Sequence, residues 1–387
     1  MIEPDNANKH IIWLLETGKD APLKAKLEIP FKYKIKMLVK NLITFLSTIS
    51  LLFLLFKNIN LKKSFYFILS FLISVAFAIY FYPNVLNKLI LFEGGNDGLL
   101  YVHFAHLISD NISNSNYALA FMGGEKAYDL MPFYRYIWVA NYLFFGESPW
   151  MLCFILTFFP LVIFKVFELV LNKKWANYFL LFWFLVPIFE AFGFFHFYYV
   201  KLTLRGFGEP LAYLLYLSGL IIMIKFYKEG KINYTNSFIL GLAISLTIGL
   251  RANILPACIV LIVFFLLKNN HIKEFKNTFF LSLGLSLTLV IPFHNYYFTN
   301  DFIPLTIAAY KDWNLGARPS DYYHLIVSIK NFNFDNILWQ KIINHINGEI
   351  KLYEVWYHAS IIICIYYLFA KKAPEIIKCI SIAALSL

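Results

Sequence analysis

Long apolar blocks, separated by short polar connections, make up most of the chain from residue 37 onward. Each block has roughly 15 to 23 residues, close to the length a helix needs to cross about 30 Å of hydrocarbon. The blocks lack strict alternation, and inside lipid a helix pairs all of its own backbone groups, so the pattern predicts membrane helices. The predicted blocks are 37–56, 64–83, 150–171, 176–198, 211–227, 236–250, 253–267, 278–297 and 356–370.

Lysine placement gives these blocks an orientation. Clusters of Lys occupy every second connection, as expected when cytoplasmic loops are enriched in basic residues. We therefore expect 84–149, 199–210, the tight link around Arg251 and 298–355 to lie on the non-cytoplasmic side. The cytoplasmic clusters are Lys57, Lys62 and Lys63; Lys173 and Lys174; Lys225, Lys228 and Lys231; Lys268, Lys273 and Lys276; and Lys371, Lys372 and Lys378.

The two long outer loops, 84–149 and 298–355, are too apolar to be disordered. The first contains two amphipathic stretches, Leu99 to Ile112 and Phe133 to Phe145, which are typical of helices that lie in the membrane interface. The sequence therefore predicts an all-α, polytopic transmembrane helical bundle with amphipathic interfacial helices in its outer loops.

The two ends of the chain are less regular. Residues 1–36 form a Lys-rich polar segment without a secretory signal pattern. If 37–56 crosses the membrane, this segment lies outside, against the lysine rule; an interfacial or re-entrant 37–56 is the equal alternative. The final run, Cys379 to Leu387, is too short to span, and we expect the polypeptide to be truncated there. The transmembrane domain is then 37–387.

Composition supports a membrane protein and removes other classes. The chain is 60% hydrophobic and 15% charged, whereas soluble proteins carry about 25% charged residues. Its net charge of +11 comes from Lys clusters between apolar blocks, which excludes a nucleic-acid groove. The cysteines lie in or beside apolar segments without metal-ligand or disulfide spacing, so we interpret them as small core residues: Cys153, Cys258, Cys364 and Cys379.

Arginine follows a different distribution from lysine. The chain has four Arg, and all fall on the predicted outer side: Arg135, Arg205, Arg251 and Arg318. The planar guanidinium holds a phosphate through two hydrogen bonds, which Lys cannot do. We expect Arg205 and Arg251, each at a helix end near the membrane, to bind an anionic group, with Arg135 next. The alternative is snorkelling or ion pairing at helix ends.

Three acidic segments of the outer loops are candidates for chemistry. Asp97, within Gly94-Gly95-Asn96-Asp97-Gly98, has the position of a general base, although an ordinary turn uses the same residues. Glu125 and Asp129 precede Arg135 among aromatics, which suits sugar binding or, alternatively, a helix cap and turn. Glu209 follows Arg205 where a helix begins, so it is either part of an anion site or a helix-start residue.

Histidine and metal signals are weaker. His294 is predicted to lie outside and is a candidate substrate-binding residue, although a lone histidine is usually structural. His103 and His106 are the one histidine pair near ligand spacing. No DxD, HExxH or CxxC motif occurs, so we name no metal ligands and leave a divalent metal open.

Several strings, taken in order, resemble a group of bacterial membrane proteins similar to the GT-C superfamily of glycosyltransferases, relatives of the dolichyl-phosphate-mannose-dependent protein mannosyltransferases. The resemblance runs from about Leu91 to Tyr323. The strings are GGNDG, MGGEKAYDLMPFYRY, FFGESPW, RGFGEP, LRANILP, HNYYFTNDFIPLTIAAY and RPSDYYHL.

The resemblance implies a multi-pass protein of the bacterial inner membrane. It would transfer sugar from a polyprenyl-phosphate donor to a glycan, lipid or protein acceptor at the outer face, with inversion. Asp97 matches the catalytic acid of the first outer loop, and basic residues would hold the lipid phosphate. Many relatives have two adjacent acids where this chain has Asn96 and Asp97, which leaves metal use open.

Two other functions compete with this interpretation. A transporter or flippase of a lipid-linked saccharide would carry charges near the membrane midplane and an internal repeat, neither of which the sequence displays. A non-catalytic subunit of an envelope-assembly complex would need no convergence of Asp97 with the arginines. The three functions are therefore distinguished by whether Asp97 and the arginines come together at one outer site.

Overall fold

The computed structural model describes residues 96–146, 155–156, 158–185, 187–189, 193–269, 275–307, 327, 331, 340, 343–344 and 355–386. All of these belong to one compact unit, Phe53–Leu387. Segment 1–36, the predicted blocks 37–56 and 64–83, and Arg318 lie outside the described residues.

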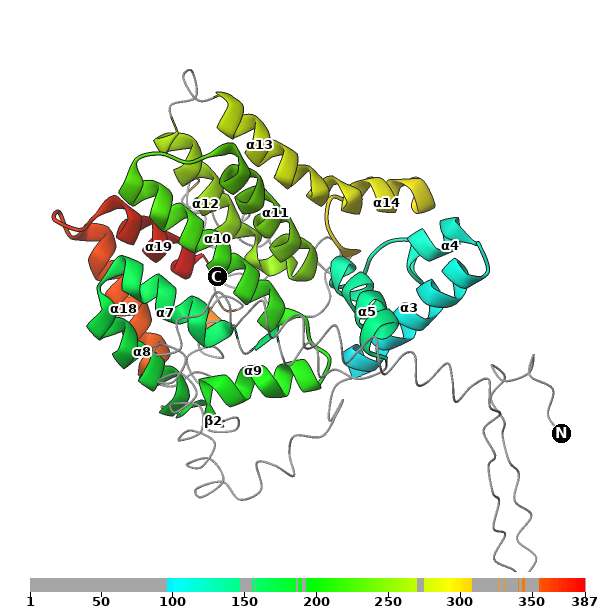
Figure 1. Cartoon of the computed structure of the whole chain (residues 1–387), viewed down its shortest axis with the longest axis horizontal. Helices are drawn as coiled ribbons and strands as arrows, with labels where there is room; N and C mark the ends of the chain where they lie inside the picture. Colours follow the sequence, from blue (N-terminus) through cyan, green and yellow to red (C-terminus); the bar gives the residue numbers. More distant parts are fainter. Residues whose placement is uncertain are drawn as a thin grey trace, which may run out of the picture. The chain divides into compact units, whose positions relative to one another are not determined.

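The described part of the chain is helical apart from one short ribbon, so the all-α prediction is confirmed there (Figure 1). The ribbon pairs β1 (Pro187–Phe189) with β2 (Gly193–Phe194) in antiparallel fashion. The α-helices are α3 (Asn96–Ser113), α4 (Tyr117–Met122), α5 (Pro132–Phe145), α7 (Phe159–Val170), α8 (Lys173–Leu185), α9 (Phe195–Leu204), α10 (Glu209–Glu229), α11 (Tyr234–Leu250), α12 (Leu255–Lys268), α13 (Phe275–Leu285), α14 (Val290–Thr299), α18 (Val355–Phe369) and α19 (Glu375–Leu385), with 3₁₀ turns η3 (Ala252–Ile254) and η4 (Ser286–Leu289).

Helices α10, α11, α12 and α18 match four predicted blocks within a few residues, and both amphipathic stretches of the first outer loop are helices, α3 and α5. The predicted helix 176–198 is wrong as a single element. Helix α8 ends at Leu185, the ribbon follows, and α9 begins at Phe195. Pro187 lacks the N–H that a helix would use, and Gly193 has no side chain to favour a helix, so the apolar run turns here.

The helices from α10 to α13 place lysines and arginines at opposite ends. Glu209, at the start of α10, forms a 2.8 Å ion pair with Arg251, at the end of α11. Because α10 and α11 are consecutive, this contact makes them antiparallel. We call this end the arginine end; it carries Arg205, Glu209 and Arg251. The opposite, lysine end carries Lys225, Lys228, Lys231, Lys268 and Lys276.

Two contacts bring together the segments that form the lysine end. Lys268, the last residue of α12, lies 5.9 Å from the ring of Tyr227 near the end of α10. The Asn277 side chain, in the first turns of α13, donates to the Ile232 carbonyl at 3.0 Å. The connections of α10 to α13 therefore alternate between two ends of the helices, and their assignment to two sides of a membrane stays a prediction.

Small residues let α11 and α13 approach closely. A Cβ on Gly241 would lie 2.3 Å from the Leu281 carbonyl oxygen, and one on Gly284 would lie 2.4 Å from that of Phe238. Ser245 donates to the Gly284 and Leu285 carbonyls, 3.0 Å from each. Small residues and hydroxyls of this kind are typical of helix interfaces in membranes.

Among the described residues, two helices are long and apolar enough to cross a membrane. One is α10, and the other is the continuous run Phe275–Thr299 formed by α13, η4 and α14. Tyr234–Leu250, Ala252–Lys268 and His358–Phe369 are shorter apolar helices. Two long helices indicate membrane association, but they are fewer than the nine predicted spans.

Candidate functional site

Segments that are distant in the sequence meet at the arginine end. A Cβ on Gly249, near the end of α11, would lie 2.1 Å from the ring of Phe133, at the start of α5. One on Gly208, just before α10, would lie 3.0 Å from the ring of Tyr134. Arg135 follows directly, so it also belongs to this end. Three of the strings, MGGEKAYDLMPFYRY, RGFGEP and LRANILP, therefore come together here.

The backbone beside Asp97 also lies at the arginine end. Helix α3 begins at Asn96, so Asn96, Asp97 and Gly98 form a first helical turn and not an isolated loop. A Cβ on Gly98 would lie 1.9 Å from the Arg205 carbonyl oxygen, so only glycine permits this approach. The Asp97 backbone is thus next to the α9–α10 connection, and its side chain lies outside the described residues.

Arg205, Glu209 and Arg251 form one electrostatic cluster. Burial raises the pKa of the Tyr198 phenol in α9, Glu209 raises this pKa further, and both arginines lower it, so the three charged groups all lie near this phenol. Two guanidinium groups and one carboxylate leave a net charge of +1. The Arg251 side chain keeps 34% of its surface exposed although it is paired with Glu209, and its buried Nε has no hydrogen-bond partner. This cluster therefore has a net positive charge and, on Arg251, a partly exposed guanidinium that an external anion could reach.

Glu209 is the first residue of α10, and Pro210 follows it within the first turn. The helix-start interpretation of Glu209 is therefore confirmed. The Glu209 carboxylate also forms the ion pair with Arg251. Glu209 is therefore both a helix-start residue and a member of the charged cluster.

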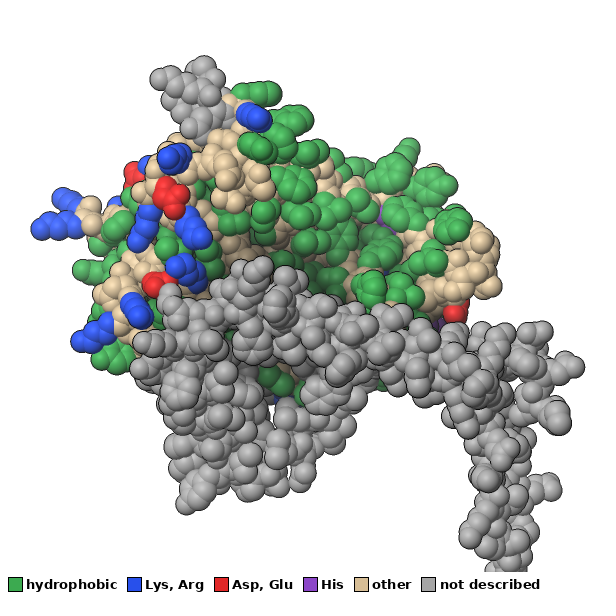
Figure 2. Space-filling model, in the orientation of Figure 1, with side chains coloured by type: hydrophobic (Ala, Val, Ile, Leu, Met, Phe, Trp, Pro, Cys, Tyr) green, Lys and Arg blue, Asp and Glu red, His purple; other side chains and the backbone are tan. Residues whose placement is uncertain are grey.

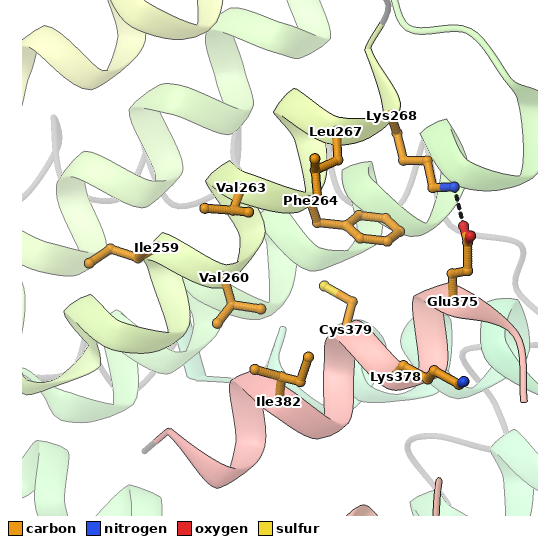
Figure 3. Close-up of a pocket in the computed structure, with 10 residues that line it drawn as sticks. All are labelled: Ile259, Val260, Val263, Phe264, Leu267, Lys268, Glu375, Lys378, Cys379 and Ile382. Carbon is orange, nitrogen blue, oxygen red and sulfur yellow. Dashed lines mark ion pairs between the residues drawn. The ribbon is translucent and has the colours of Figure 1, made fainter. Parts of the chain in front are cut away.

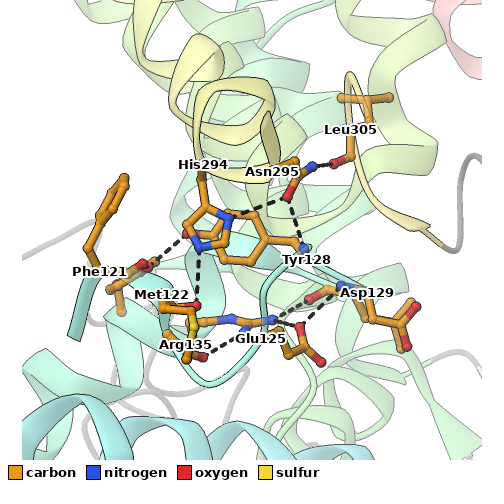
Figure 4. A network of polar contacts seen from close by, with 12 residues as sticks. Phe121, Met122, Glu125, Tyr128, Asp129, Arg135, His294, Asn295 and Leu305 are labelled. Carbon is orange, nitrogen blue, oxygen red and sulfur yellow. Dashed lines mark hydrogen bonds and ion pairs between the residues drawn. The ribbon is translucent and has the colours of Figure 1, made fainter. Parts of the chain in front are cut away.

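Arg135 is placed differently, because its side chain is fully buried and already engaged. One of its nitrogens lies 2.7 Å from the Glu125 carboxylate and also donates to the Leu130 carbonyl at 3.2 Å. The other terminal nitrogen donates to the Gly123 carbonyl at 2.8 Å (Figure 4). The guanidinium therefore fastens the loop between α4 and α5.

Two aromatic rings complete the surroundings of this guanidinium. Its central carbon lies 4.3 Å from the Phe104 ring centre and 4.8 Å from that of Tyr128. Cation–π contacts of this kind strengthen when water is excluded. The geometry favours Arg205 and Arg251 over Arg135 as ligands of an external anion.

Glu125 and Asp129 lie close together in this loop. The Asp129 backbone N–H donates to the Glu125 carboxylate at 3.1 Å. Burial raises the pKa of the Asp129 carboxyl, the Glu125 charge raises it further, and Arg135 acts in the opposite direction. The predicted sugar-binding role of the two acids stays a prediction; what the geometry displays is a folded turn.

His294 is built into the same network from α14. Its ring stacks on Tyr128 with centres 3.7 Å apart, and its Nε2 lies 3.1 Å from the Met122 carbonyl oxygen. Tyr128 and Tyr136 share a 2.8 Å hydrogen bond between their hydroxyls. Burial raises the pKa of both phenols, so both stay protonated as donors.

Asn295, adjacent to His294, was not among the predicted residues. Its carbonyl oxygen accepts from the Tyr128 N–H at 3.0 Å, and its amide nitrogen donates to the Ile303 and Leu305 carbonyls (Figure 4). It therefore ties α14 to the first outer loop and to the segment that follows α14. A His-Asn pair inside an otherwise apolar helix was the signal for it.

Metal ligation finds no support in the part of the chain that the structure describes, where no three His, Cys, Asp or Glu side chains gather. His103 and His106 lie on α3 without a third ligand. A cavity beside Tyr134 and Phe207 has a volume of about 10 Å³, room for a single water.

The predicted residues thus fall into two groups at one end of the helices. Glu125, Asp129, Arg135 and His294 form an internal network, while Arg205, Glu209 and Arg251 form a partly exposed basic cluster. The two groups meet where Gly208 packs on Tyr134. No protein-family model, curated protein or solved structure matches the chain.

Proposed function

We propose that the chain is a multi-pass membrane glycosyltransferase of the GT-C type, which moves a sugar from a polyprenyl-phosphate donor to an envelope acceptor at the arginine end. The observation that carries this proposal is convergence. Strings that resemble the family in sequence meet at one end of the helices, and that end carries Arg135, Arg205 and Arg251.

A membrane location is supported by the surface of α13 and α14. Apolar side chains spaced four residues apart stand out from this run: Phe275, Phe279 and Leu283 are 70%, 52% and 48% exposed, and Phe293 and Tyr297 are each 61% exposed. Figure 2 shows hydrophobic side chains over α13 and α14, while basic side chains gather on the side of the α18–α19 connection. Exposed apolar stripes of this kind fit lipid contact.

The donor phosphate would bind the cluster of Arg205 and Arg251. Arg251 already has one nitrogen on Glu209, which orients the guanidinium and leaves its exposed part for a phosphate oxygen. Arg205 lies with its guanidinium 5.2 Å from the Phe207 ring, beside the same helix start. The dipole of α10 adds partial positive charge at this end.

In the proposed reaction Asp97 takes the proton of the acceptor hydroxyl. The acceptor oxygen forms a bond to the anomeric carbon, the bond from that carbon to the phosphate oxygen breaks, and the polyprenyl phosphate leaves with the bonding electrons. The two arginines stabilise the charge on that leaving phosphate. A single displacement with one base inverts the anomeric centre.

Donor kinetics test the arginine assignment. Arg205→Lys and Arg251→Lys keep the charge and lose the two-pronged hydrogen bonding, so each should weaken donor use about ten- to hundredfold. Lys225→Arg, at the opposite end of α10, is the matched control and should leave the kinetics unchanged. If both Arg→Lys variants use donor as well as the parent, the donor binds elsewhere.

Asp97→Asn tests the base. Transfer should be lost while expression and thermal stability are kept, because the change removes only the proton acceptor. Asp110→Asn, at an exposed acid on the same helix, controls for loss of charge and should be fully active. An active Asp97→Asn variant would remove Asp97 from the mechanism, and donor translocation without transfer would indicate a flippase.

A further inference from the structure

A groove of about 470 Å³ lies between α12 and α19, away from the arginine cluster (Figure 3). Its walls are Ile259, Val260, Val263, Phe264 and Leu267 from α12, with Cys379 and Ile382 from α19. Because α12 ends at Lys268, the groove occupies the half of this helix nearer the lysine end. Its volume is in the range of small-ligand sites, about 300–1,000 Å³.

The wall of the groove is apolar and accessible. Ile259, Val263 and Leu267 are spaced four residues apart on α12 and are 48%, 47% and 77% exposed. Helical residues at this spacing share one face. An accessible trough of branched aliphatic side chains is unfavourable in water and favourable against hydrocarbon.

Charge is confined to one end of the groove. Lys268 forms an ion pair with Glu375, the first residue of α19, and Lys378 lies one turn further along that helix. In Figure 3 these three side chains occupy one end and the aliphatic side chains the other. Two ammonium groups and one carboxylate leave a net charge of +1. Lys371 and Lys372, both exposed in the α18–α19 connection, add to the positive field.

We infer that this groove holds one acyl chain of an anionic phospholipid from the leaflet at the lysine end, with the phosphate at Lys378 and Lys268. An apolar trough closed by cations matches a molecule with an apolar tail and an anionic head. Glu375 orients Lys268, and among the described residues Lys378 has no acidic partner. A zwitterionic lipid carries no net charge to match the cationic end.

This lipid is distinct from the proposed sugar donor, whose phosphate is assigned to the arginine end. The inference rests on the proposed membrane location and not on glycosyl transfer. Its test therefore reads lipid contact directly and needs no sugar donor.

The experiment uses the full-length chain in phosphatidylcholine nanodiscs that contain a phosphatidylglycerol probe with a photoactivatable acyl chain. After irradiation, peptide mass spectrometry should map the probe to 259–267 and to α19. Val263→Trp fills the groove and should reduce this labelling at least fivefold. Leu283→Trp is the matched control, since Leu283 is equally exposed, 48%, on α13 outside the groove; it should label like the parent.

The head group is tested by charge reversal. Lys378→Glu should lower groove labelling by the phosphatidylglycerol probe about tenfold and leave labelling by a phosphatidylcholine probe unchanged. Lys225→Glu, an exposed lysine of α10 at the same end, should change neither. The inference is overturned if the two probes label the groove equally in the parent, if Lys225→Glu has the same effect, or if labelling avoids the groove. Sugar transfer by the parent would survive any of these results.

Discussion

Removal of the Glu125 carboxylate would leave the Arg135 guanidinium buried without its counter-charge. The Arg135 side chain is fully buried, and its ion pair with Glu125 is 2.7 Å long. Glu125→Gln keeps a carbonyl oxygen of similar size at this position, so the substitution removes charge with little change of volume.

The size of the effect follows from burial. Loss of one partner from a buried ion pair costs about 3–5 kcal/mol. Glu125 keeps 21% of its side chain exposed, and the Gly123 and Leu130 carbonyls still accept from Arg135, so we expect about 2–4 kcal/mol. Glu209→Gln is the matched comparison: its partner Arg251 is 34% exposed and reaches water more easily, so about 1 kcal/mol or less is expected.

Native cysteines provide the assay. Cys258 is completely buried and Cys379 is 4% exposed, so a fluorogenic thiol reagent reports their exposure as the detergent-solubilised chain unfolds. The expected loss corresponds to an apparent Tm about 2–5 °C lower for Glu125→Gln. Arg135→Met combined with Glu125→Gln should lose less than the sum of the two single changes, because the interaction is already broken.

Equal melting of Glu125→Gln and the parent would refute this reasoning. So would a Glu209→Gln variant that melts below Glu125→Gln, since the expected order is set by the burial of the arginine left behind, and Arg135 is fully buried while Arg251 is 34% exposed. Additive losses in the Arg135 and Glu125 double variant would mean that the two residues do not interact.

Three further outcomes are expected. Gly241→Ala should lower the thiol-monitored Tm by the equivalent of about 1–3 kcal/mol, because its Cβ meets backbone; Gly219→Ala, whose Cβ meets ordinary contacts at 3.4 Å or more, should not. The native state holds the Asp129 proton more tightly than the unfolded chain, so this carboxyl stabilises most below its ordinary pKa of 3.8 and less as pH rises through the raised value. Asp129→Asn should therefore melt above the parent at pH 7, and this difference should vanish at acidic pH. Cysteines at the exposed Asn114 and Lys231 should react with an impermeant thiol reagent from outside and inside, respectively; the reverse pattern would invert the topology.

Long apolar runs made the helices predictable, and the breaks within them were harder to see. Helices α10, α11 and α12 lie close to their predicted blocks because each block ends at charged or helix-breaking residues. The apolar run 176–198 predicts one helix, although Pro187 lies in its middle. Apolar composition alone does not distinguish a continuous helix from two helices joined by a turn.

The sequence predicts most of the residues of the candidate site but only part of their arrangement in space. The separate behaviour of arginine and lysine located Arg135, Arg205 and Arg251 at one end. Sequence did not reveal that Arg135 is enclosed by its own loop while Arg251 stays partly open, because burial depends on packing between distant segments. Asn295 was not predicted for the same reason: its partners lie in two separate segments, the first outer loop and the segment after α14.

The Ser245 contact between α11 and α13 has a consequence for biogenesis. The Ser245 hydroxyl donates to the carbonyls of Gly284 and Leu285, directly before the 3₁₀ turn that joins α13 to α14. It also shares a 2.8 Å hydrogen bond with the Thr288 hydroxyl inside that turn. A helix that tightens mid-span presents weakly bonded carbonyls to its surroundings, and lipid offers them no donor. The donor belongs to a helix made earlier on the ribosome. In the proposed membrane topology α13 would therefore be stable across its whole length only beside α11, so the two would leave the translocon as a pair.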